Sequence, residues 1–202
     1  MRPLTIQLNE FAAFDFFPFQ PLNAEQRIPL VLVLPGGGYL YLSTREAKPV
    51  ALRLNTNALH AVVLRYTTAS QRDLKRDDLL AEVRAALAWL ETQAETYQID
   101  TTKISVMGFS AGGNLAAHCA NEMADKFNKA ILVYPATSFA AVPADMLEAG
   151  FQRLFARVAN PELDEDRIRQ TMFRLFADDP TLGITERNMP GLCLSNRRRH
   201  HS

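Results

Sequence analysis

Cysteine is scarce in this sequence, charge of neither sign is in excess, and long apolar runs are missing. Only Cys119 and Cys193 occur, at no metal-ligand spacing. The 22 basic side chains balance the 22 acidic ones, which argues against a surface for nucleic acids or other polyanions. No apolar run approaches the length of a membrane span, and the N-terminus lacks the apolar core of a signal peptide. We therefore expect a soluble cytoplasmic protein with no metal, no cofactor, no nucleic-acid partner and no membrane contact.

Short apolar runs separated by helical patterns organise the chain. The runs suit strands that are buried on both faces, and they cover residues 28–35, 60–66, 103–109 and 129–135. Between the second and third runs, apolar residues recur at helical intervals from Leu79 to Ala94. Strands that alternate with helices predict an α/β fold with a doubly wound, mostly parallel sheet. We expect one domain over residues 1–202, and nothing in the sequence indicates its oligomeric state.

Three further segments carry weaker patterns. The looser alternation of residues 4–19 predicts an antiparallel pair of strands at the edge of the sheet. Residues 45–54 have a helical pattern that Pro49 interrupts near its start. Residues 161–176 also predict a helix, with Asn160 as its N-cap.

The stretch VMGFSAGGNL, residues 106–115, places a serine between glycines directly after a predicted strand. A strand, the pattern Gly-x-Ser-x-Gly and a helix together form a nucleophile elbow. Its turn is so sharp that the positions two before and two after the serine have no room for side chains, and Gly108 and Gly112 meet that need. Ser110 would expose its hydroxyl above the sheet, at a helix N-terminus that favours negative charge. The alternative is an ordinary serine N-cap at a glycine-rich helix start.

A second glycine-rich segment, LPGGGY at residues 34–39, follows the first predicted strand. Glycines let the main chain approach a ligand closely, and N–H groups aimed at a carbonyl oxygen lower the barrier to acyl transfer. The alternatives are a flexible turn and a phosphate-binding loop. Neither GxGxxG nor GxxxxGK is present, so the nucleotide alternative is weakly supported.

Together the two glycine motifs resemble the α/β-hydrolase superfamily. With STREAKPVALRLN and AVVLRY, they are similar to the bacterial esterase branch related to acetyl-xylan and feruloyl esterases, over residues 28–137. This resemblance implies a serine carboxylic-ester hydrolase that acts on a small-molecule ester. It implies that Ser110 is the nucleophile and that Gly37, Gly38 and Ala111 provide the N–H groups of the oxyanion hole.

The same resemblance implies that residues 137–176 form a cap, or lid, over the site. A helical pattern of large apolar residues in this region suits the lining of an acyl pocket. Packing of the same residues against the edge of the sheet is the alternative.

In the family's pattern an acid and then a histidine follow the serine. No histidine of this sequence is expected where it could activate Ser110. His60 opens a predicted strand and should lie at the other end of the sheet. His118 is eight residues further along one helix, which is about 12 Å at 1.5 Å per residue. His200 and His201 lie in the basic tail LCLSNRRRHHS, where solvated side chains are expected.

The acid is also missing from its expected place. No apolar strand precedes Asp178 and Asp179, so they are better explained as the C-terminal turn of a helix. Synonymous codons for residues 192–202, read with a one-base shift, can encode FVCQTADDTTV, which is similar to the family's next strand and acid loop. We therefore hypothesise a frameshift that replaces the last strand-helix units and leaves residues 131–134 as an open sheet edge. Sequencing of the locus tests this hypothesis.

The sequence thus predicts an incomplete α/β-hydrolase domain of esterase type, with weak or no activity in this chain. Two alternatives stay open. One is a fragment of a prolyl-oligopeptidase-like serine peptidase, since such enzymes also use a GxSxGG elbow. The other is a non-catalytic binding protein on the hydrolase fold.

Overall fold

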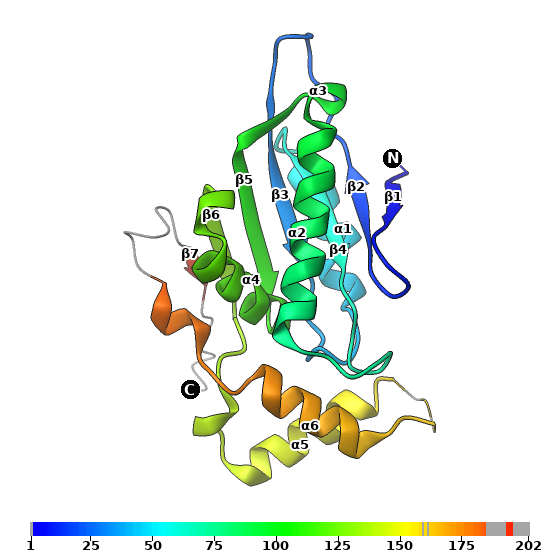
Figure 1. The fold of residues 1–202 in the computed structure, drawn as a ribbon, viewed down its shortest axis with the longest axis vertical. Helices are drawn as coiled ribbons and strands as arrows, with labels where there is room; N and C mark the ends of the chain where they lie inside the picture. Colours follow the sequence, from blue (N-terminus) through cyan, green and yellow to red (C-terminus); the bar gives the residue numbers. More distant parts are fainter. Residues whose placement is uncertain (1, 159, 161, 185–192, 196–202) are drawn as a thin grey trace, which may run out of the picture.

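A single twisted sheet with helices on both faces forms the body of the molecule (Figure 1). The computed structural model describes residues 2–158, 160, 162–184 and 193–195. The seven strands among these residues have the order β1-β2-β4-β3-β5-β6-β7. The central strands pair in parallel and are β3 (Ile28–Leu34), β4 (His60–Arg65), β5 (Ile99–Phe109) and β6 (Lys129–Val133). The predicted α/β class with a mostly parallel sheet is confirmed.

The first two strands form the antiparallel edge that the sequence predicts. β1 (Leu4–Gln7) pairs with β2 (Ala13–Phe17), and β2 pairs antiparallel with β4. The side chain of Asn9 closes the turn between them, because its Oδ1 accepts hydrogen bonds from the N–H groups of Phe11 and Ala12 at 2.8 and 2.7 Å.

Alternation along the central strands creates two apolar layers. In β3, Leu30 and Leu32 face the larger core, whereas Val31 and Val33 face the smaller one. The larger core is covered by α2 (Arg76–Thr92) and α4 (Ala111–Glu122), and the smaller one by α1 (Lys48–Asn55). The short α3 (Ala94–Tyr97) leads into β5. No helix in the described part of the chain has the length and apolar character needed to cross a bilayer.

Two helix starts differ from the predicted ones. Pro49 does not interrupt a helix but lies in the first turn of α1, where its missing N–H would have no helical partner in any case. A separate 3₁₀ turn, Thr44–Glu46, precedes it. Helix α6 (Glu165–Leu175) begins after Asp164, whose carboxylate accepts a hydrogen bond from the Arg167 N–H at 3.0 Å, so Asn160 is not its N-cap.

The far edge of the sheet also differs from the prediction. The expectation of an open edge at residues 131–134 is wrong, because β7 (Cys193–Ser195) pairs in parallel with β6 and sets Ile131 opposite Cys193. Among the described residues, the outermost strand on this side is therefore β7.

After β6 the chain leaves the sheet and forms a pair of helices beyond the carboxyl ends of the parallel strands (Figure 1). They are α5 (Ala144–Phe155) and α6. Aromatic contacts join them, with the Phe139 ring 6.0 Å from that of Phe151 and 5.7 Å from that of Phe173. Parallel sheets of this type bind ligands outside the carboxyl ends of their strands, so the helix pair lies over the end at which a site is expected.

Candidate active site

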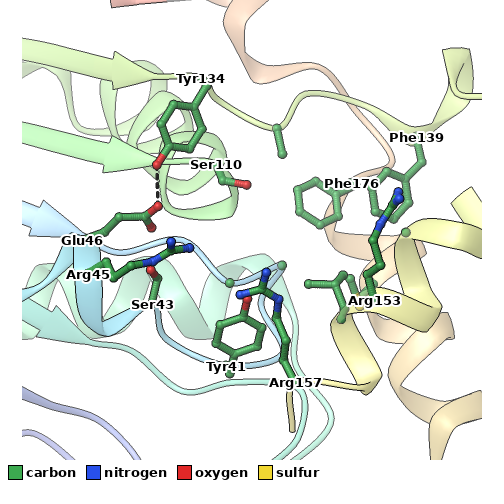
Figure 2. A pocket seen from close by; sticks show the side chains of 16 residues that line it. Tyr41, Ser43, Arg45, Glu46, Ser110, Tyr134, Phe139, Arg153, Arg157 and Phe176 are labelled. Carbon is green, nitrogen blue, oxygen red and sulfur yellow. Dashed lines mark hydrogen bonds between the residues drawn. The ribbon is translucent and has the colours of Figure 1, made fainter. Parts of the chain in front are cut away.

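Ser110 occupies the turn between β5 and α4, at the carboxyl end of a central strand. Its φ of 50° and ψ of −116° are unusual for a residue with a side chain. Three main-chain hydrogen bonds hold it there: its N–H donates to the Val133 carbonyl at 3.1 Å, and its carbonyl accepts from Asn114 and Ala136 at 3.0 and 2.9 Å. The turn is therefore fixed from three sides, and the Ser110 side chain lines a cavity (Figure 2).

The glycines that flank Ser110 have no space for a side chain. A Cβ atom on Gly108 would lie 2.0 Å from the carbonyl oxygen of Gly112, and one on Gly112 would lie 2.0 Å from that of Leu34. Real Cβ atoms do not approach oxygen so closely. Both positions therefore require glycine, as the elbow pattern predicts.

The glycine loop at residues 35–39 follows β3 and lies directly beside Ser110. Gly37 and Gly38 have φ values of 131° and 66°, which only glycine adopts readily. A Cβ atom on Gly36 would lie 3.1 Å from the Cβ atom of Ser110. Tyr39 ties the loop to α4, because its hydroxyl donates to Oδ1 of Asn114 at 2.9 Å.

The loop, the elbow and the two outer helices enclose a cavity of about 400 Å³. Ser110, Gly37 and Gly38 all line it, so the structure brings these three predicted site residues together. Ala111 is fully buried next to Ser110 as the first residue of α4 and is not among the lining residues. The apolar part of the wall comes from Tyr41, Phe139, Leu154, Met172 and Phe176.

The carboxylate of Glu46 and the phenol of Tyr134 complete the wall of the cavity on the sheet side, and neither was predicted from the sequence. Glu46 accepts a hydrogen bond from the Gly36 N–H at 2.8 Å through one oxygen and from the Tyr134 hydroxyl through the other. Burial and the bond to Glu46 raise the pKa of Tyr134 well above its ordinary value. Tyr134 also has a φ of 36°, a strained value for a tyrosine. Glu46 lies in the STREAKP segment, ten residues after Gly36, but no pattern in the sequence pairs it with the loop.

The structure places no described histidine beside Ser110. His60 lies at the amino end of β4, where its Nδ1 accepts a hydrogen bond from the Phe19 N–H at 2.9 Å. His118 is buried on α4, and burial, with a smaller contribution from Arg76, lowers its pKa to about 4. Neither lines the cavity. His200 and His201 lie outside the described residues.

The two candidate acids have structural roles. Asp178 forms an ion pair with Arg76 at 2.7 Å, and Asp179 caps a short 3₁₀ turn by accepting the Thr181 N–H at 2.9 Å. Neither lines the cavity. In the part of the chain that the structure describes, no three His, Cys, Asp or Glu side chains are grouped to hold a metal ion.

Known proteins with similar sequences or structures are hydrolases and larger synthases. Endo-1,4-beta-xylanase B of Butyrivibrio fibrisolvens is 33% identical over 123 residues, which are 55% of this chain and 19% of the xylanase. Ethyl acetate hydrolase of Pseudomonas putida is 28% identical over 166 residues, which are 64% of this chain and 51% of that enzyme. The solved structure of an α/β hydrolase, MGS-M1, from a Medee basin deep-sea metagenome library is 32% identical with a TM-score of 0.62, and covers 70% of this chain and 60% of that one. This chain thus spans less than two thirds of each of these three proteins.

The match to a protein family includes both glycine motifs. The family described as BD-FAE matches residues 18–144, more than half of the 202 residues. This range contains the glycine loop, the elbow with Ser110, and Glu46 with Tyr134. The chain belongs to the BD-FAE family of α/β hydrolases.

Proposed function

We propose that this protein hydrolyses carboxylic esters of small molecules through an acyl-enzyme at Ser110. The observation that carries the proposal is the shared cavity, in which the strained Ser110 turn and the Gly37–Gly38 turn form one wall. Family membership supports ester hydrolysis, and so does the name of a relative that acts on ethyl acetate.

The chemistry requires a nucleophile and a place for negative charge. Oγ of Ser110 would attack the carbonyl carbon, the bond to the alcohol oxygen would break, and the alcohol would leave with the proton. Water would then cleave the acyl-serine and release the acid. The N–H groups of Gly37, Gly38 and Ala111 donate to no described residue, so they are free to stabilise the oxyanion.

We also propose that residues 137–176 act as the cap over this site. Leu154 of α5 lies close to the glycine loop, since a Cβ atom on Gly38 would be 2.9 Å from its Cδ1. Met172 of α6 and Phe176 line the same cavity. An apolar roof of this kind would bind the acyl or alcohol group and exclude part of the water.

A fluorophosphonate probe tests the proposal, because it is electrophilic enough to form a stable adduct with a serine that turns over esters only slowly. Intact-mass and peptide analysis should find one adduct on Ser110, and Ser110→Ala should remove it. Ser43→Ala is the matched control, since Ser43 lines the same cavity and its loss should leave the adduct in place. An adduct on Ser43 alone, or none, would contradict the proposal.

The peptidase and binding alternatives give different results. A serine peptidase of prolyl-oligopeptidase type would release p-nitroaniline from a proline anilide faster than p-nitrophenol from p-nitrophenyl acetate. A binding protein would retain a short-chain ester without forming any adduct. We expect acyl transfer from the ester and none from the anilide.

The Glu46 carboxylate should set the rate of adduct formation by fixing the loop. Glu46→Gln keeps the shape but replaces the charged acceptor of the Gly36 N–H, and hydrogen bonds to charged groups contribute about 1.5–3 kcal/mol. We expect phosphonylation of Ser110 to slow by roughly tenfold, and Tyr134→Phe to have a smaller effect because it leaves the bond to Gly36 intact. Time-resolved mass spectrometry measures both rates. Equal rates for Glu46→Gln and the unchanged chain would mean that Glu46 does not position the loop.

A further inference from the structure

Three arginines line the cavity beside Ser110: Arg45, Arg153 and Arg157. Arg153 lies in the last turn of α5 and Arg157 in the turn that follows. In Figure 2, the side chains of Arg45 and Arg157 extend into the cavity from opposite walls. None of the three forms an ion pair or a side-chain hydrogen bond with a described residue.

Two of the three arginines of α6, which lie outside the lining of the cavity, form ion pairs. Arg169 pairs with Glu148 at 2.8 Å, and Arg174 pairs with Asp73. The chain as a whole has no net charge. The three cations that line the cavity therefore do not follow from a general excess of basic residues.

Glu46 is the one carboxylate among the residues that line this cavity, and it forms no ion pair with a described arginine. Its one negative charge against the three arginines leaves a formal excess of two positive charges. Its two oxygens already accept hydrogen bonds from the Gly36 N–H and the Tyr134 hydroxyl. The N-terminus of α4 adds partial positive charge behind Ser110. The cavity thus combines an apolar roof with a wall that has a net positive charge.

Placing like charges together disfavours the folded state unless an anion binds. The C-terminus of α5 offsets part of the repulsion between Arg153 and Arg157, because that end of a helix carries partial negative charge. The helix dipole explains why the two cations are tolerated there. The helix dipole does not explain why Arg153 and Arg157 line the cavity together with Arg45. Binding of an anion does explain it, because two or three guanidinium groups are well suited to bind one carboxylate.

We propose that the cavity selects esters whose acyl or alcohol part carries a carboxylate, which Arg45 and Arg157 bind from opposite walls while Arg153 adds to the positive charge of the cavity. This inference rests on the proposed function, since it takes Ser110 as the residue that reacts. Exposed ion pairs contribute little each, but several cations around one partly enclosed anion act together. We expect roughly a tenfold preference for an anionic ester over its neutral analogue at low ionic strength, and a smaller one in high salt.

Two pairs of activated esters test the selectivity and the position of the charge. The mono-p-nitrophenyl ester of terephthalate and its methyl ester differ by one charge on the acyl side, and the para geometry prevents the carboxylate from attacking its own ester. The acetyl ester of 4-hydroxybenzoate and its methyl ester differ by one charge on the alcohol side. Mass spectrometry follows acylation of Ser110 in a single turnover. In at least one pair the anionic ester should react about tenfold faster, and that pair identifies the side on which the arginines bind.

Variants separate the arginines from a general effect of charge. The double variant Arg153→Gln and Arg157→Gln should remove the preference, so that the anionic and the neutral ester of that pair acylate Ser110 at the same rate. Arg53→Gln is the matched control, because Arg53 is exposed, forms no ion pair in the described chain and lies on α1 away from the cavity. It should keep the preference. Equal acylation by charged and neutral esters in both pairs would overturn the inference and leave the proposed function standing.

A binding measurement keeps the inference testable if no ester acylates the chain. Calorimetry on Ser110→Ala compares monomethyl succinate with dimethyl succinate. Tighter binding of the monoester, lost in the double arginine variant, would support an anion-selective cavity although the proposed hydrolysis had failed. Binding of both compounds with the same affinity would overturn the inference.

Discussion

Hydrolysis of p-nitrophenyl acetate by the 202-residue chain is expected to exceed the reaction in water by at most about 10³- to 10⁴-fold. This is the residual acceleration that an oxyanion hole and substrate binding give when a catalytic triad is broken. Complete enzymes of this kind are several orders of magnitude faster. Alkyl esters with poor leaving groups should show almost no turnover.

The physical reason is that no described histidine lies where it can take the proton of Ser110. A serine hydroxyl is a weak nucleophile until a neighbouring base removes its proton. His60 lies at the opposite end of the sheet, and His118 faces the core from α4 with a pKa of about 4. Tyr134 lines the cavity, but its hydroxyl donates to Glu46, and its raised pKa keeps it protonated.

Initial rates of the chain and of Ser110→Ala measure the effect. We expect the substitution to lower the residual hydrolysis only modestly, although it abolishes the fluorophosphonate adduct, because the probe is far more electrophilic than an ester. Rapid turnover of alkyl esters would contradict the prediction and would mean that a base exists. His200→Ala and His201→Ala would then be the first substitutions to test.

Local patterns in the sequence were enough to predict the wall of the site that comes from the sheet. The glycines around Ser110 and the loop after β3 sit beside continuous apolar runs, and each fulfils a steric need that acts within a few residues. Ser110 and Gly38 therefore could be expected in one cavity. The pairing of Glu46 with Tyr134 could not, because it joins residues 88 positions apart that share no pattern.

The misplaced boundaries have a similar cause. Asn160 and Asp164 are both good N-cap residues, and the choice between them depends on where α6 packs against α5 rather than on either residue. The strand β7 has only three residues, and a segment that short carries no detectable alternation. Its pairing with β6 is a tertiary contact that the sequence does not reveal.

Gly112→Ala is expected to lower the free energy of unfolding by at least about 3 kcal/mol, the upper range for overpacking a core. The added methyl group would lie 2.0 Å from the Leu34 carbonyl oxygen and 2.5 Å from that of Pro35. Both atoms belong to the backbone at the end of β3, so no side chain can rotate away. The strand and α4 would have to separate, and the loop that follows β3 would move away from Ser110.

A second glycine in a helix provides the control. Gly150 lies within α5, and a Cβ atom there would meet nothing within 4 Å. Gly150→Ala should therefore stabilise the protein by about 0.5–1 kcal/mol, the ordinary gain from replacing glycine inside a helix. Urea unfolding curves of the two variants should move in opposite directions. If Gly112→Ala unfolds at the same urea concentration as the unchanged chain, the contact between the elbow and β3 is looser than the structure has it. The requirement for glycine two residues after Ser110 would then not be steric.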